Sequence, residues 1–148
     1  MTAPERADRV AAAYLDSNIV IPLVEALGER RLRFADRLAR LLGANAVYVV
    51  SDLVRMECKV KPLASGDGRL VLEIDRFLAS VRFVCVSLPS ESFDRAAEIR
   101  ARFRYRTPDA LHLAAAIEAE CDLFVTADRR LSTFTEIPIV LLRPGEPG

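Results

Sequence analysis

The chain has 148 residues, of which 51% are hydrophobic, and its 21 lysines and arginines balance its 21 aspartates and glutamates. The apolar fraction excludes a disordered chain, and the zero net charge means that any affinity for nucleic acid must come from a local patch. Three widely spaced cysteines argue against a disulfide scaffold or a zinc site, and no apolar run is long enough to span a membrane. We therefore expect one cytoplasmic domain over residues 1–148, with reduced thiols and no signal peptide.

The first half of the chain alternates strand-like and helix-like segments. An apolar run at 11–15 predicts a strand that ends at Asp16. A helix should begin near Asp16 or Ser17 and stop at Gly28, with Pro22 shortening or kinking it. Beyond it, the pattern predicts a helix at 29–42, a strand at 46–50, a helix capped by Ser51 that runs to Pro62, and a helix at 69–80.

The second half continues the alternation. Thr107 can cap a helix, with Pro108 at its first position and Asp109 in its first turn. Five apolar strands separated by helices predict an α/β fold in three layers, with helices on both faces of a central parallel sheet of four to five strands. The other elements predicted in this half are strands at 82–88, 123–127 and 139–142 and a helix at 89–104.

Four acidic residues fall where this fold would bring them together. Asp16 and Asp128 follow strands, and Asp109 begins a helix that runs back from the same edge of the sheet. Glu57 lies about two turns into the helix after the second strand, within reach of that edge. Open α/β sheets bind their ligands outside the carboxyl ends of the strands. Asp122 instead precedes its strand, roughly 20 Å from Asp128 at about 3.3 Å per residue, and is interpreted as a solvated strand start.

The convergence of these acids, rather than any one of them, indicates a metal site. Alone, Asp16 could cap a helix and Asp109 could interact favourably with a helix N-terminus. Glu57 could be a solvated helix residue, and Asp128 a turn residue. Together, four carboxylates would repel one another and raise each other's pKa values, and a hard cation such as Mg²⁺ or Mn²⁺ removes that repulsion. Such a site can activate water and hold the oxygens of a phosphodiester.

The chain has a single histidine, His112, one turn after Asp109. Cleavage by two histidines acting as acid and base is therefore excluded. No nucleophile elbow or phosphate-binding glycine loop is present either. His112 itself is interpreted as a core residue or as a hydrogen-bond partner of a metal-binding acid.

The same segments resemble a known family. YLDSNIVI, SDLVRMECKVKPL, RTPDALHLAAAI and LFVTADRRL, in this order and spacing, resemble PIN-domain ribonucleases, and most closely the VapC-type toxins of bacterial toxin–antitoxin pairs. The resemblance implies an Mg²⁺- or Mn²⁺-dependent endoribonuclease with an RNA substrate and a cognate antitoxin as partner. It implies catalytic and metal-binding roles for Asp16, Glu57, Asp109 and Asp128, with Thr126 and Asn18 in support.

Arginines cluster beside these acids, at Arg102, Arg104, Arg106 and Arg129. One interpretation is that those before Asp109 interact with the C-terminal dipole of their helix. The other is a patch that binds RNA phosphates, with Phe103 and Tyr105 available to stack on bases.

Two other function classes stay open on the sequence. A phospho-receiver-like signalling module also gathers acids at strand ends, but Asp16 lacks a neighbouring acid and Arg143 stands in place of the usual lysine. A non-catalytic RNA- or protein-binding domain could use the same fold. We also expect a homodimer, and we expect the helices at 17–28 and 31–43 to form part of a groove for an antitoxin segment.

Overall fold

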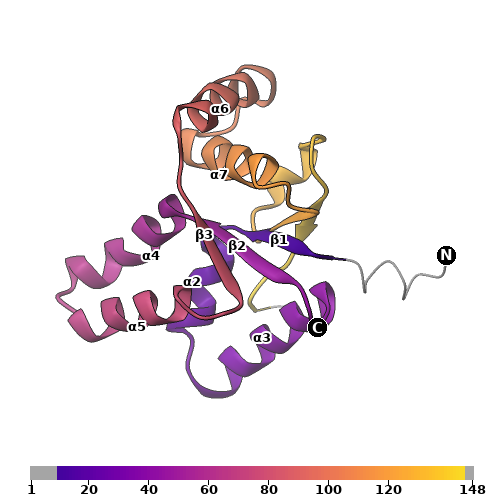
Figure 1. The fold of residues 1–148 in the computed structure, drawn as a ribbon. Coiled ribbons are helices and arrows are strands. Elements are labelled where there is room, and N and C mark those ends of the chain that lie inside the picture. The colour runs from indigo at the N-terminus through magenta and orange to yellow at the C-terminus, as the bar shows by residue number, and fades with distance from the viewer. Residues whose placement is uncertain (1–9, 146–148) are drawn as a thin grey trace.

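The computed structural model describes residues 10–145. Within that part of the chain five strands form one parallel sheet in the order β3-β2-β1-β4-β5, as Figure 1 shows. The predicted α/β fold with a parallel sheet of four to five strands is confirmed. The strands are β1 (Ala12–Leu15), β2 (Val47–Ser51), β3 (Phe83–Val86), β4 (Leu123–Thr126) and β5 (Ile139–Leu141).

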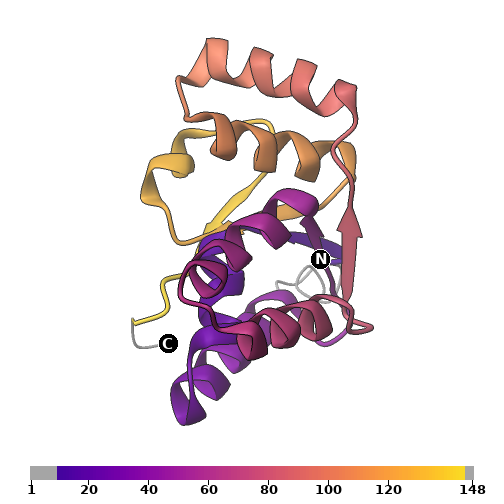
Figure 2. The same ribbon diagram turned by 90° about the vertical axis from the view of Figure 1, so that its left-hand side faces the viewer.

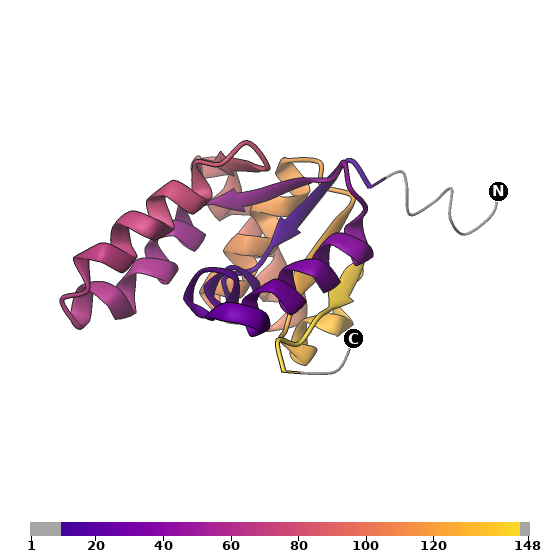
Figure 3. The same cartoon turned by 90° about the horizontal axis from the view of Figure 1, so that it is seen from below.

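Helices cover both faces of the sheet. On one face α7 packs against β2 and β4, and α6 packs on the outside of α7 (Figures 1 and 2). On the other face lie α2 and α3, while α4 and α5 form a helical hairpin that extends past the sheet (Figure 3). The helices are α2 (Ser17–Glu25), α3 (Gly28–Leu42), α4 (Asp52–Ala64), α5 (Gly68–Leu78), α6 (Ser90–Phe103), α7 (Thr107–Glu118) and the 3₁₀ helix η1 (Arg129–Thr133).

The core includes the central strands, α7 on one face and the buried sides of α2 and α3 on the other. Tyr14 on β1 and Phe124 on β4 are fully buried, and their rings stack with centroids 5.3 Å apart. The α7 residues Asp109–Ala116 are all buried, which explains why this helix is apolar almost all round. Its alanines present little volume, so α7 can lie close to the sheet, and this closeness holds its first turn at the carboxyl edge.

Several helix ends differ from the sequence prediction. The first helix continues through Pro22 but ends at Glu25, and Gly28 begins α3 with a φ of 60° instead of ending α2. Helix α4 likewise continues past Pro62 to Ala64. A proline inside a helix removes one backbone hydrogen bond and crowds the carbonyl four residues before it, so each of these helices continues at the cost of one bond.

Two predicted caps also differ. Ser51 is the residue before α4, but its side chain makes no capping bond, because its hydroxyl lies 2.8 Å from that of Tyr14. Thr107 is already helical, and Arg106 takes the cap position without a side-chain capping bond. Pro108 at the helix start and Asp109 in its first turn are confirmed.

Asp122 is exposed at the start of β4, as predicted, but solvation is only part of its role. Its Oδ2 accepts hydrogen bonds from the backbone N–H of Ala11, at 2.8 Å, and of Ala12, at 3.0 Å. The carboxylate thus ties the start of β4 to the start of β1, at the opposite end of the sheet from Asp128.

The described cysteines, Cys58, Cys85 and Cys121, form no disulfide. No helix among residues 10–145 has the length and apolar character needed to cross a membrane.

Candidate active site

A cavity of about 450 Å³ opens at the carboxyl edge of the sheet. All four acids nominated from the sequence line it. The full lining is Asp16, Ser17, Asn18, Ile21, Glu57, Val60, Arg106, Pro108, Asp109, His112 and Asp128. The elements β1, α2, α4, α7 and the end of β4 therefore each supply part of one pocket.

Asp16 is the most buried of these acids. It follows β1 and caps α2, where Oδ1 accepts from the backbone N–H of Ser17 at 2.8 Å. Its Oδ2 accepts from the hydroxyl of Thr126 at 2.8 Å. Burial raises the pKa of Asp16, and the nearby charge of Asp109 raises it further, although His112 and these hydrogen bonds act in the opposite direction. The acid therefore has negative charge that the protein only partly compensates.

Glu57 lies in the second turn of α4 and reaches back to the sheet edge. Its Oε1 accepts a hydrogen bond from the Ser17 hydroxyl at 2.6 Å and lies 2.5 Å from Nε2 of His112. Partial burial alone would raise the pKa of Glu57, but the hydrogen bonds from His112 and Ser17 outweigh it and the pKa is lowered. Glu57 is thus held as an ionised carboxylate.

Asp109 enters the pocket from the first turn of α7. Its Oδ2 lies 3.5 Å from Nε of Arg106 and 3.7 Å from Nη2 of Arg130. The sharp return of the chain that brings it there passes through Arg104, which ends α6 in the left-handed conformation at φ 61°. Few residues other than glycine and asparagine adopt this conformation, so this turn is held by the packing of α6 on α7.

Asp128 is engaged by a side chain of its own segment. Its Oδ1 caps η1 by accepting from the backbone N–H of Arg130 at 3.0 Å, and Nη2 of the same arginine lies 2.5 Å from Oδ2. The Arg130 guanidinium lowers the pKa of Asp128. The arginine also lies between Asp128 and Asp109, so it balances part of the charge at the mouth of the pocket.

Thr126 and Asn18 join the two strand ends beneath the acids. The buried Thr126 hydroxyl donates to Asp16 and accepts from the backbone N–H of Asp128 at 3.0 Å. Asn18 donates to Thr126 at 3.2 Å and accepts from the backbone N–H of Ala127 at 3.0 Å. These bonds fix the orientation of Asp16 relative to the loop that carries Asp128.

The acids line the cavity without closing on one point. Among residues 10–145, no three or more Asp, Glu, His or Cys side chains are close enough to enclose an ion directly. Arg106 lies beside Asp109 instead, and Arg130 lies beside both Asp109 and Asp128. The donor set nevertheless fits a hard divalent cation, because it consists of carboxylate oxygens and because burial of Asp16 makes its ionised form costly without one.

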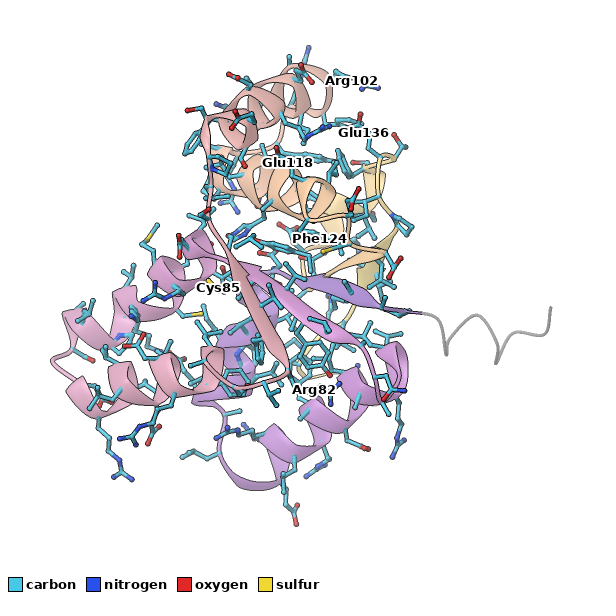
Figure 4. The ribbon with its side chains drawn as sticks, in the orientation of Figure 1. Arg82, Cys85, Arg102, Glu118, Phe124 and Glu136 are labelled. Atoms are coloured by element: carbon cyan, nitrogen blue, oxygen red, sulfur yellow. The ribbon has the colours of Figure 1, made fainter. Side chains whose placement is uncertain are left out.

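The predicted arginine patch is dispersed. Of the four nominated arginines only Arg106 lines the cavity. Figure 4 shows Arg102 at the end of α6 close to Glu136, and their side chains pair at 3.0 Å. Arg104 is the exposed C-cap of α6, and Arg129 is exposed beyond Asp128.

The predicted stacking aromatics are already packed against the protein. Tyr105 is 8% exposed, and its ring stacks on that of Phe103 with centroids 5.5 Å apart. The ring of Phe134 lies edge-on to both. Tyr105 is therefore a core residue, and the prediction that it is available to stack on RNA bases was wrong.

The sequence identified some of these contacts only weakly. His112 was open to either interpretation, and the structure places it against Glu57. Nothing in the sequence indicates a role for Ser17 or Arg130 except that each lies within two residues of one of the acids. Tyr14 was missed, although it lies two residues before Asp16, on the same face of β1, because side chains alternate along a strand.

Residues 13–137 match the PIN domain family. The chain belongs to the PIN domain family. No curated protein sequence matches it significantly. The receiver-like alternative is thus set aside in favour of the PIN family, which consists typically of nucleases.

Solved structures share the fold at low sequence identity. A chain of VapBC2 from Rickettsia felis, crystallised with a DNA fragment from its promoter, is similar with a TM-score of 0.70 and 15% identity over 88% of this PIN chain and 98% of that one. Mycobacterium tuberculosis VapC20, described as a sarcin–ricin loop cleaving toxin, gives 0.65 and 16% over 85% and 98%. A toxin–antitoxin complex from Klebsiella pneumoniae gives 0.63 and 20% over 91% and 99%.

Removing Arg130 should change the titration of Asp128. In the Arg130→Ala variant the pKa of Asp128 should rise toward the ordinary carboxyl range, because the guanidinium that stabilises the ionised form is gone. Since the lowered pKa contributes stability above the ordinary carboxyl pKa, the stability gap between wild type and variant should close as the pH falls through the pKa of folded Asp128. Carboxyl-carbon NMR titration measures the shift.

Arg129→Ala is the matched control, since Arg129 is exposed and has no ion pair among the described residues. An Asp128 pKa that is unchanged in Arg130→Ala, or that moves equally in Arg129→Ala, would contradict the role assigned to Arg130.

Proposed function

We propose that this PIN-domain chain is an Mg²⁺- or Mn²⁺-dependent endoribonuclease and the toxin of a toxin–antitoxin pair. The observation that carries the proposal is the set of four acids, Asp16, Glu57, Asp109 and Asp128, lining one cavity. The only histidine of the chain is bonded to one of those acids, so no free imidazole remains as an alternative acid or base.

The proposed chemistry is hydrolysis of an RNA phosphodiester. Bound to the acids, the cation would supply a polarised water and charge stabilisation for the departing oxygen. Asp16, Asp109 and Glu57 would hold it, with Asp128 at the mouth as a further oxygen donor. Asn18 and Thr126 keep Asp16 oriented, and Arg106 on the cavity wall is placed to attract a phosphate.

Solved structures with the same fold support this function. VapC20 shares the fold and is described as cleaving the sarcin–ricin loop. Two further similar structures are toxin–antitoxin assemblies. Buried acids lower stability unless they serve a ligand, so their presence at this cavity favours a site that binds a cation.

Cleavage of RNA should require a divalent cation and should stop with EDTA. Asp16→Asn and Asp109→Asn should each cut the rate roughly 100-fold or more, a loss of about 2.7 kcal/mol of transition-state stabilisation, while the protein stays folded. Gel-based cleavage assays with Mg²⁺ or Mn²⁺, alongside thermal melting, measure both effects.

Asp122→Asn is the matched control, because it removes a carboxylate at the far end of β4 while the amide oxygen can still accept from Ala11 and Ala12. Full cleavage in EDTA would refute the cation mechanism. Equal loss in the control would show that the effect of Asp16→Asn reflects folding.

We propose that RNA contacts involve Arg106 and, beyond it, Arg104 and Arg129, with Arg102 contributing less because it pairs with Glu136. Arg106→Ala should weaken RNA binding and reduce the slope of log affinity against log salt by about 1. Arg102→Ala should change the slope less. Fluorescence anisotropy on a catalytically inactive Asp16→Asn background measures both, and equal slopes in wild type and Arg106→Ala would exclude Arg106 from the RNA contact.

We further propose an antitoxin partner and a homodimer. Large apolar side chains remain exposed at the residue before α3 and on α3, α4 and α5, among them Leu27, Leu32, Val60, Leu63 and Leu72. Helix α2, which was also expected to form part of the groove, carries none of the exposed large apolar side chains among the described residues. Exposed apolar groups of this kind favour a covering partner, and an apolar helix carrying a basic side chain would suit a groove beside an acidic cavity.

Co-expression with the product of an adjacent small reading frame tests the partner. The expected result is a stable complex, by size-exclusion chromatography, with suppressed cleavage. A protein that expresses harmlessly alone, stays monomeric and binds no such product would contradict both the partner and the toxin role.

A further inference from the structure

A chain of hydrogen bonds runs from the sheet core to Glu57. The hydroxyls of Ser51 and Tyr14 lie 2.8 Å apart, and the Tyr14 oxygen lies 2.8 Å from Nδ1 of His112. Nε2 of His112 lies 2.5 Å from Oε1 of Glu57. Ser51 and Tyr14 are fully buried and His112 is 2% exposed, so these groups must satisfy one another's hydrogen bonds within the protein.

The chemistry of the groups gives the chain a direction. Ionised Glu57 can only accept, so Nε2 of His112 must donate to it. In a neutral imidazole the other nitrogen is an acceptor, so the Tyr14 hydroxyl donates to Nδ1. A phenol ordinarily keeps its proton at neutral pH, so the Tyr14 hydroxyl is available as that donor. The Ser51 hydroxyl can then donate to the Tyr14 oxygen, and every member has a partner.

Both hydrogen bonds that Glu57 accepts fall on the same carboxylate oxygen. Both donors, His112 and Ser17, bind Oε1, and no hydrogen bond from residues 10–145 reaches Oε2. A glutamate has three side-chain torsions, so an unrestrained Glu57 would sample many positions. Two short bonds to Oε1 restrict that freedom and leave Oε2 for a ligand.

We propose that His112 and Tyr14 are positioning residues that hold Glu57 for a divalent cation: Glu57 requires the Nε2–H tautomer of His112, and Tyr14 supports that tautomer by donating to Nδ1. The inference rests on the proposed function for the identity of the ligand. A histidine that only filled the core would satisfy its nitrogens equally well in either tautomer and would have no effect on the pocket. The continuous, one-directional chain to a cavity-lining carboxylate distinguishes the two roles.

The single histidine allows the tautomer to be read directly. Two-bond ¹H–¹⁵N NMR spectra of metal-free wild type should show the Nε2–H form of His112. Tyr14→Phe should keep this tautomer, which Glu57 requires, but should shift the Nδ1 resonance, because Nδ1 loses its donor. Tyr48→Phe is the matched control: it removes a hydroxyl from a buried tyrosine on the neighbouring strand, where the partner is Arg82. It should leave the His112 signals unchanged, and an Nδ1–H tautomer in wild type would overturn the inference.

Cation affinity tests the consequence for Glu57. By calorimetry, Tyr14→Phe should bind Mn²⁺ about tenfold more weakly than wild type, and His112→Leu more weakly still. His112→Gln, whose amide can donate toward Glu57, should recover part of the loss, and Tyr48→Phe should lose nothing.

The outcomes separate this inference from the proposed function. If wild type binds Mn²⁺ and Tyr14→Phe binds it equally well, the positioning role is overturned while the nuclease proposal stands. If folded wild type binds no Mn²⁺, the proposed function fails, and the positioning of Glu57 for a cation fails with it, whatever the tautomer.

Discussion

The parallel pairing of β1 with β4 is the constraint on which the pocket depends. Leu15 pairs with Val125, so the next residues, Asp16 and Thr126, come level at the end of the sheet. The backbone N–H of Asp16 donates to the carbonyl of Val125 at 3.0 Å, which continues the pairing into the site. A slip of one residue would turn Thr126 to the opposite face and remove its hydroxyl from Asp16.

The pocket also depends on how deeply its charged groups are buried, and the acids differ in this respect. Asp16 is 6% exposed and has a raised pKa, whereas Glu57 is more open and has a lowered one. The difference follows first from burial, which raises the pKa of Asp16 more than its hydrogen bonds lower it, with a smaller contribution from the charge of Asp109. Glu57 is less buried, and the hydrogen bonds from His112 and Ser17 lower its pKa. The four acids of one cavity therefore differ in how strongly the protein itself stabilises their ionised forms.

The apolar helix α7 connects the packing of the core with the positions of the groups in the pocket. This helix is apolar on nearly all sides and is therefore buried, and Asp109 and His112 are buried together with its alanines. One turn separates these two residues, so the helix places an acid in the cavity and, one turn further along, a donor behind Glu57. The packing that stabilises the core is therefore the same packing that assembles the pocket.

Local patterns in the sequence predicted the strands, their parallel arrangement and the edge where the acids would lie, because these follow from hydrophobic periodicity and connection rules. They could not predict side-chain contacts between distant elements. Tyr14 and His112 are 98 residues apart, and Arg102 finds Glu136 34 residues away. The first contact connects the core to the site, and the second draws Arg102 away from the expected RNA patch. Neither contact can be predicted from the local hydrophobic periodicity.

The most direct test of the central claim is a crystal structure determined with Mn²⁺, in which anomalous scattering locates the ion. We expect one or more peaks in the cavity within ligand distance of Asp16 and at least one other of the four acids, with Arg130 displaced from Asp109. Well-ordered crystals at millimolar Mn²⁺ with no peak in the cavity, or with peaks only elsewhere on the surface, would contradict it.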